Sequence, residues 1–154
     1  MRTMLLSFRQ DVFQRVISGD KIYEHRRSFP DEPVKAYVYV SRPTQAICGI
    51  MYLSNKTSLN EWKEKYKDDL ACVGRIEDYL KQHQYGMEIN KFVFTNAIPL
   101  ADLKRDLSKF LIPRSYYYLE DTELLAYLEK NIIVQDKCIT HSFDHITSDM
   151  ICKS

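Results

Sequence analysis

The sequence predicts an α+β domain built around a mixed sheet, because segments typical of strands are interrupted by amphipathic helices without regular alternation. The chain has 154 residues, of which 45% are hydrophobic, and this is enough for the core of one domain. No internal repeat and no Pro- or Gly-rich linker divides it. Whether the sheet curls into a barrel is left open by the pattern alone.

The first third of the chain predicts one strand, one helix and then three strands. Residues 4–8 (MLLSF) form a short apolar strand, and Ser7 with Gln10 makes a possible capping box for a helix. Gly19 stands where that helix should end, since glycine adopts a positive φ at low cost. The three strands that follow are expected at residues 21–29, 34–41 and 46–53.

The remainder alternates helices with one long strand. Ser58 and Glu61 form a second capping box, and Thr122 can cap the last helix. Apolar spacing then predicts, in order, a helix over 58–70, a helix over 75–83, a strand over 86–100, a helical turn within 103–110 and a helix after 122.

The charge balance limits the kinds of partner. Lysine and arginine total 22 against 21 acidic residues, so the net charge of +1 provides no overall field for duplex nucleic acid or an anionic membrane. An anion site in this chain therefore has to be local.

Targeting signals and cysteines favour a cytoplasmic protein. The opening residues 1–8 contain too short an apolar run for a signal peptide, and no stretch approaches a membrane span. The four cysteines are scattered without a CxxC motif, which is typical of reduced thiols.

The C-terminal segment contains three candidate metal ligands. Cys138, His141 and His145 suggest zinc by their spacing, but no fourth ligand stands at a standard distance in the sequence. A packed or frayed tail is the favoured interpretation, with neither a metal nor a cofactor expected.

Residues 19–29 (GDKIYEHRRSF) place charge where a strand should be apolar. Alternation puts Glu24 and Arg26 on the same side, while His25 and Arg27 are expected to be exposed on the other. Arg26 offers a planar fork for a phosphate or carboxylate, and Glu24 can orient it or accept a hydrogen bond from a base. Alternatively, the charges form an ion pair that only closes one end of the fold.

The same segment resembles the opening of an ASCH domain. The family signature matches Gly19, Lys21, Glu24 and Arg26, and "VKAYVYVSRPTQAICGIMYL" is similar to the strand, corner and strand that follow in the family. The resemblance continues from "YGMEINKF" to "IPRSYYYL", where Ile112 and Arg114 depart from the usual Pro and Gln.

This resemblance implies a PUA-like mixed β-barrel flanked by helices over residues 1–131, with 132–154 as an extension packed on the domain or trailing from it. It also implies an RNA, nucleotide or nucleoside ligand in a cleft where the first helix meets the second strand. No membrane partner is implied, and the oligomeric state stays open. The ligand-binding residues expected from it are Lys21, Glu24, Arg26, Ser41, Arg42, Ser115 and Tyr116.

Two points within that expectation are left open. Tyr116 and the two tyrosines after it can either stack on a base or pack in the core. His83, on the back of a predicted helix, is expected at the surface.

A hydrolase is the alternative function. Some small relatives are amidohydrolases acting on N-acetylated cytidine, and some are ribonucleases. A threonine stands in the amidohydrolases where this chain has Glu24, so the hydroxyl nucleophile is missing, although Lys21 and Glu24 could act as acid and base on RNA or a modified nucleoside. Binding is therefore favoured over catalysis, and a purely structural charge cluster is the third interpretation.

Overall fold

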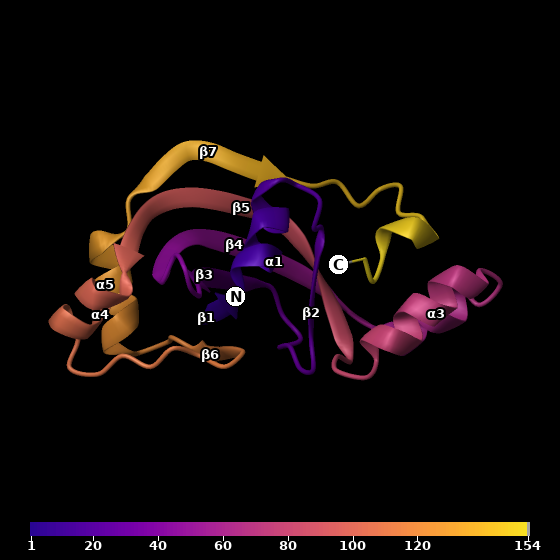
Figure 1. The fold of residues 1–154 in the computed structure, drawn as a ribbon, viewed down its shortest axis with the longest axis horizontal. Coiled ribbons are helices and arrows are strands. Elements are labelled where there is room, and N and C mark those ends of the chain that lie inside the picture. The colour runs from indigo at the N-terminus through magenta and orange to yellow at the C-terminus, as the bar shows by residue number, and fades with distance from the viewer. Residues whose placement is uncertain (154) are drawn as a thin grey trace.

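The computed structural model describes residues 1–153, which form one curled mixed sheet with helices around it (Figure 1). The strands are β1 (Arg2–Phe8), β2 (Tyr23–Arg26), β3 (Val34–Val40), β4 (Ala46–Ser58), β5 (Tyr85–Pro99), β6 (Tyr116–Tyr118) and β7 (Val134–Thr140). The helices are α1 (Gln10–Ile17), α2 (Leu59–Lys65), α3 (Leu70–Tyr79), α4 (Leu100–Asp106), α5 (Glu123–Asn131) and the short 3-10 turn η1 (Ser148–Met150).

The strand order across the sheet is β2-β5-β4-β3-β1-β6. Strand β7 also pairs with β5, over Lys91 to Thr95, beyond the residues of β5 that pair with β2. Strands β1 and β3 are parallel, from Arg2 opposite Val34 to Phe8 opposite Val40. The other pairings are antiparallel. The predicted α+β class with a mixed sheet is confirmed, and the bend of the long strands β4 and β5 gives the sheet its half-barrel shape (Figure 1).

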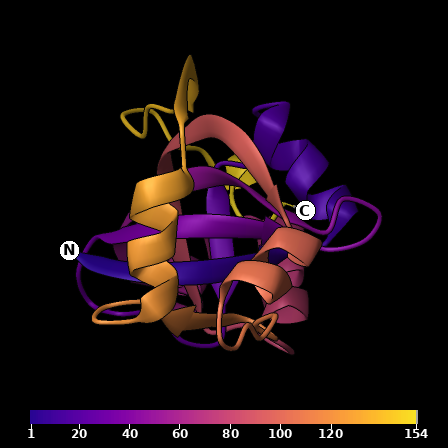
Figure 2. The ribbon, with the colours of Figure 1, turned by 90° about the vertical axis from the view of Figure 1, so that its left-hand side faces the viewer.

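Alternation along the strands creates an apolar layer on each face of the sheet. Leu6 of β1 packs with Phe13 and Val16 of α1, whereas Leu5 faces the layer that contains Leu128 of α5. Figure 2 shows α4 and α5 together at one end of the sheet, away from α1. Helix α1 is therefore left beside β2, where the charged segment begins.

A third apolar cluster joins α2 and α3 to the C-terminal segment. Trp62 and Ile76 are buried with Ile151 and Cys152. Ser148 Oγ donates a hydrogen bond to the Asp69 carboxylate at 2.5 Å. The end of the described chain is thus packed against the start of α3.

Local capping signals were partly confirmed. The side chains of Ser58 and Thr122 accept backbone hydrogen bonds at the starts of α2 and α5, as predicted. The capping box at Ser7 and Gln10 is wrong, because Ser7 continues β1 and the N-cap of α1 is Arg9. Pairing with β3 continues through Phe8, so Ser7 stays in the strand and cannot cap the helix.

Helix boundaries in the middle of the chain also differ from the prediction. The predicted helix over 58–70 ends at Lys65 in the structure, and α3 begins at Leu70 with Asp69 as its cap.

None of the helices within residues 1–153 combines the length and the apolar character that crossing a bilayer requires.

Candidate functional site

A tight turn after α1 delivers Lys21 into the interior. Gly19 has a φ of +85° and donates a backbone hydrogen bond to the Val16 carbonyl at 3.1 Å. Lys21 N then donates to the Arg15 carbonyl at 2.9 Å, which folds the chain back along the end of the helix. Only 6% of Lys21 is exposed to solvent. The glycine in the motif is therefore explained by the turn that buries this lysine.

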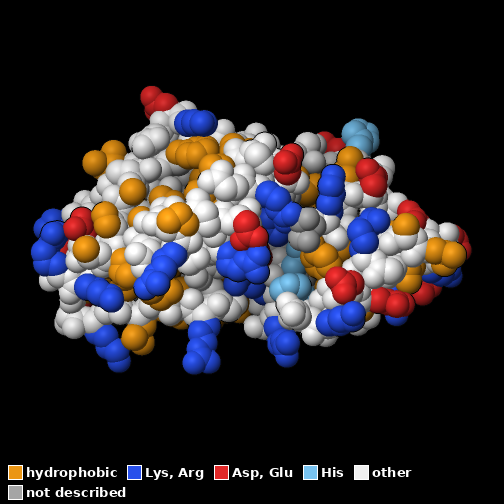
Figure 3. Space-filling view, in the orientation of Figure 1, with side chains coloured by type: hydrophobic (Ala, Val, Ile, Leu, Met, Phe, Trp, Pro, Cys, Tyr) orange, Lys and Arg blue, Asp and Glu red, His pale blue; other side chains and the backbone are white. Residues whose placement is uncertain are grey.

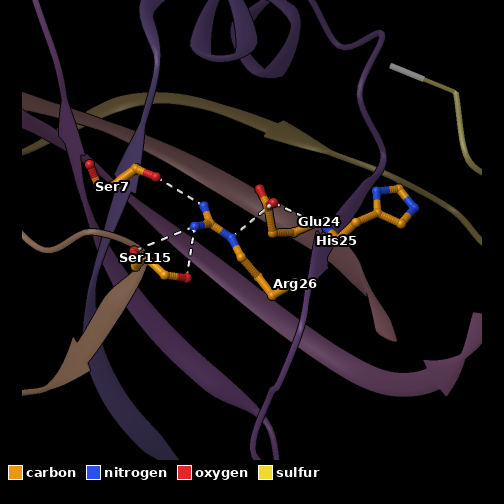
Figure 4. A network of polar contacts seen from close by, with 5 residues as sticks. All are labelled: Ser7, Glu24, His25, Arg26 and Ser115. Atoms are coloured by element: carbon orange, nitrogen blue, oxygen red, sulfur yellow. Dashed lines mark hydrogen bonds and ion pairs between the residues drawn. The ribbon is translucent and has the colours of Figure 1, made fainter. Parts of the chain in front are cut away.

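Arg26 forms the centre of a polar network between the edges of the sheet (Figure 4). Its Nε donates to Glu24 Oε1 at 3.2 Å, and its Nη2 donates to the Ser7 carbonyl at 2.9 Å. Its Nη1 donates to Ser115 Oγ at 3.0 Å. Glu24 Oε1 also accepts the backbone N–H of His25 at 3.1 Å.

This network joins parts of the sheet that share no backbone ladder. Strand β2 is paired with β5, whereas Ser7 lies on β1 and Ser115 just ahead of β6. Most N–H groups of the Arg26 guanidinium donate hydrogen bonds to Glu24, Ser7 and Ser115. The first role of Arg26 is therefore to hold the curled sheet together. The ion pair foreseen between Glu24 and Arg26 is present, and it also borders a cleft.

The cleft has a volume of ≈ 780 Å³ and lies between α1, β2 and the end of α3. Its lining contains six basic residues and two acidic ones, in a chain where the two kinds are nearly equal in number. The acidic residues are Glu24 and Asp78, and the basic ones are Arg9, Arg15, Lys21, Arg26, Lys81 and Arg114. Figure 3 shows Lys and Arg side chains on this face, with histidine among them.

Lys21 and Glu24 have unusual electrostatic surroundings. Burial lowers the pKa of Lys21 below its ordinary value, Glu24 opposes this shift, and the charges of Arg15 and Arg26 add to it. Glu24 is 4% exposed, and its Oε2 is buried without a hydrogen-bond partner within residues 1–153. A buried carboxylate oxygen without a partner is unusual in a folded protein, which marks Glu24 as a candidate site residue.

The expected ligand-binding residues do not all converge. Ser41 lines the cleft together with Lys21, Glu24 and Arg26, and Ser115 reaches it through its hydrogen bond to Arg26. Arg42 is exposed and lies outside the cleft lining.

Tyr116 also lies outside the lining. Its ring stacks on Phe29 with centroids 6.2 Å apart and planes 8° from parallel. Of the two interpretations of this tyrosine, the contacts therefore favour packing over a base platform.

The expectation for one histidine, His25, was wrong. His25 was expected to be exposed, but it is 4% exposed because α2 and α3 cover that side of β2. Burial holds the pKa of His25 well below its usual range, and neither ring nitrogen has a hydrogen-bond partner in the described chain. His83 is only partly exposed and lines the cleft.

Metal ligands do not gather in the described part of the chain. No group of three or more His, Cys, Asp or Glu side chains there is arranged to hold an ion. Cys138 lies on β7, a strand that the sequence did not predict, and not on a helical face.

Comparison with known proteins connects the chain to others through its structure. The sequence matches no protein-family model and no curated protein. Among solved structures it is similar to that of ASCH from Zymomonas mobilis, with 19% identity, a TM-score of 0.62, and coverage of 86% of this chain and 96% of that one.

Two mutant structures of the Zymomonas mobilis protein give the same result. A tyrosine-to-phenylalanine mutant matches with a TM-score of 0.58 over 86% of this chain and 100% of that one. A serine-to-alanine mutant matches with a TM-score of 0.57 over 84% and 96%. Both are 19% identical to this chain. The fold is therefore ASCH-like.

Proposed function

We propose that this chain, whose fold is ASCH-like, binds single-stranded RNA or a nucleotide in the cleft at Lys21. The observation that carries the proposal is the state of the Lys21 ammonium. The side chain is buried, yet no carboxylate oxygen within residues 1–153 lies within ion-pair distance of its Nζ. A buried charge without a partner costs several kcal/mol, and a bound phosphate oxygen offsets that cost.

The distribution of ion pairs around the cleft supports an anionic ligand. Arg9 is paired with Asp11 at 2.6 Å, and Lys81 is paired with Asp78 at 3.2 Å. Within the described chain, Arg15 and Arg114 form no ion pair and share the lining with Lys21. Three cations without an ion pair in the described chain, gathered around one cleft, favour phosphate over a neutral ligand.

Size and charge favour one or a few unstacked nucleotides over a duplex. The volume of ≈ 780 Å³ falls in the range of about 300–1,000 Å³ that is usual for small-molecule sites. A net charge of +1 provides little attraction for the long phosphate array of a duplex.

The roles of the residues follow from their contacts. Lys21 neutralises a phosphate, while Arg15 and Arg114 extend the positive field along the cleft. Glu24 fixes the orientation of Arg26 through Oε1. Its unpartnered Oε2 can accept a hydrogen bond from a base amino group or a ribose hydroxyl, which makes Glu24 the residue for selectivity.

The test is a fluorescence-anisotropy titration of a panel of short labelled oligoribonucleotides. Lys21→Ala should weaken binding by roughly tenfold to a hundredfold, which corresponds to one lost charge-assisted hydrogen bond. Glu24→Gln should change the preferred base more than the overall affinity. The matched control is Lys104→Ala, since Lys104 is an exposed lysine of α4 outside the cleft. Equal affinities of wild type and Lys21→Ala for every oligonucleotide refute the proposal.

The salt dependence gives a second measure of the same contact. Because few phosphates fit against the cleft, the slope of log affinity against log salt should be shallow, roughly −0.7 to −1.4 for one or two contacts on a single strand. A much steeper slope indicates binding along an extended surface instead.

A hydrolase acting on RNA or a modified nucleoside is the second candidate function. The specific observation is that Lys21, with its lowered pKa, and the unpartnered oxygen of Glu24 share one cleft, an arrangement suited to acid–base chemistry. Mass spectrometry of RNA incubated with the protein tests it. Cleavage should be lost in Glu24→Gln and kept in Lys104→Ala. N-acetylated cytidine should stay intact, because Glu24 stands where the related amidohydrolases have a threonine.

A further inference from the structure

One wall of the cleft is aromatic, in contrast to its cationic floor. The end of α3 and the loop after it contribute Tyr79 and His83 to the lining. His83 is half-buried, and its ring makes no hydrogen bond to another residue in the described part of the chain. The ring is therefore presented to the cleft without a polar partner to explain its position.

The ring of His83 is supported from the protein side by two other rings. Its centroid lies 6.3 Å from that of His25 and 5.9 Å from that of Tyr79, with interplanar angles of 42° and 53°. His25 lies in turn 4.8 Å from Tyr79 in an edge-to-face arrangement. This packing holds His83 from behind and leaves its exposed portion toward the cavity that it lines.

Backbone hydrogen bonds fix His83 relative to the charged strand. Its N–H donates to the Tyr79 carbonyl at 2.9 Å, and the next residue, Gln84, donates to the Arg26 carbonyl at 3.1 Å. The wall is thus tied to the strand that carries Glu24 and Arg26. A ligand whose phosphate binds at Lys21 therefore has the ring of His83 at a fixed position relative to it.

The ring also has the right charge state for stacking. Burial is the main cause that lowers the pKa of the His83 imidazole below its ordinary value of 6.5. The positive charges of Lys21, Arg26 and Arg27 also lower this pKa, and the negative charge of Glu24 opposes them. The imidazole is therefore neutral at pH 7. Burial likewise keeps His25 behind it neutral. A neutral imidazole is a weak phosphate ligand, but its face stacks on a nucleobase as other aromatic side chains do.

We propose that His83 is the base-stacking residue of the cleft, so that one nucleobase lies on its ring while the adjoining phosphate lies at Lys21. This inference rests on the proposed function, because it names where the base of the bound nucleotide sits. It assigns affinity for the phosphate to the cationic floor of the cleft and affinity for the base to the aromatic wall.

The experiment compares a short labelled oligoribonucleotide that the wild type binds with a version lacking one base but carrying the same phosphates. Wild type should bind the abasic version about fivefold to a hundredfold more weakly. His83→Ala should lose affinity for the intact strand by a similar factor and bind both versions equally. His83→Phe keeps a ring without nitrogens and should restore the discrimination. His145→Ala, an exposed histidine of the tail, should behave as wild type.

The outcomes separate the two proposals. If the wild type binds no oligoribonucleotide at all, the proposed function fails and this inference fails with it. If the wild type binds and Lys21→Ala weakens binding, but His83→Ala discriminates the abasic strand as wild type does, the function stands and the stacking role is refuted. If His83→Phe behaves as His83→Ala while both melt as wild type does, the nitrogens act as polar contacts and stacking is also refuted.

Discussion

Arg26 and Ser115 are 89 positions apart in the chain, yet Arg26 Nη1 donates a hydrogen bond to Ser115 Oγ at 3.0 Å. The same guanidinium reaches the Ser7 carbonyl, so one side chain of β2 joins the opposite edge of the sheet. Glu24 orients it from two residues away. The charges in the second strand thus have a structural role, and Lys21 is the member of the motif that is left without an ion pair within residues 1–153.

Arg26→Ala should lower the free energy of unfolding by about 3–5 kcal/mol, because it leaves the buried carboxylate of Glu24 without its partner. Arg26→Lys keeps a charge but cannot reach Ser7, Ser115 and Glu24 at once, so it should be intermediate. Urea unfolding measures both. The neighbouring exposed residue provides the control, since Arg27→Ala should change the free energy by less than about 0.5 kcal/mol. Equal losses in the free energy of unfolding for Arg26→Ala and Arg27→Ala would contradict the structural role of Arg26.

Two glycines should respond to alanine in opposite directions. A Cβ at Gly49 of β4 meets Phe92 Cζ at 2.1 Å, and Phe92 is 1% exposed, so Gly49→Ala should destabilise the protein by at least about 1–3 kcal/mol. A Cβ at Gly74 within α3 meets no atom within 4 Å. Gly74→Ala should therefore add about 1 kcal/mol of helix stability. Thermal melts of the two variants check both signs, and a stable Gly49→Ala protein contradicts the packing of β4 on β5.

His25 should make the fold sensitive to acid. Its pKa in the folded state lies well below the ordinary 6.5, mainly because of burial, so the unfolded state binds more protons below pH 6.5. The stabilisation is complete above that pH and decreases as pH falls toward the folded-state value, by up to about 1.4 kcal/mol per pH unit.

His25→Phe should remove that part of the pH dependence, which urea unfolding at several pH values measures. It should cost little at pH 7, because neither nitrogen has a partner to lose. His145→Phe is the control at an exposed position. An unchanged slope in His25→Phe, with the fold intact, contradicts a buried neutral histidine.

Elements with a strong local signal were predicted from the sequence. The caps at Ser58 and Thr122 act within one turn of their helices, so neighbouring residues determine them. Strand β7 was missed because its side chains are mostly exposed and its conformation depends on pairing with β5, which is distant in the chain. The three residues of β6 likewise become a strand only against β1.

The candidate site divides in the same way. Glu24 and Arg26 were identified because charge inside an apolar strand is unusual in any fold, and Lys21 because it matches the signature of the ASCH family. Arg15, Arg114 and His83 carry no such mark, since only the tertiary structure brings α1, the segment before β6 and the end of α3 around one cleft. The burial of His25 depends similarly on α2 and α3, which no pattern in residues 19–29 indicates.

The most direct test of the account is an NMR titration of the Lys21 ammonium with pH, in the absence and presence of an oligoribonucleotide from the panel. In the free protein the pKa of Lys21 should lie below 10.5, because the group is buried among Arg15 and Arg26. A phosphate bound beside it should raise that pKa, since an opposite charge favours the protonated form. A Lys21 pKa that stays the same when the protein is saturated with the RNA would contradict the central claim that this lysine binds the phosphate.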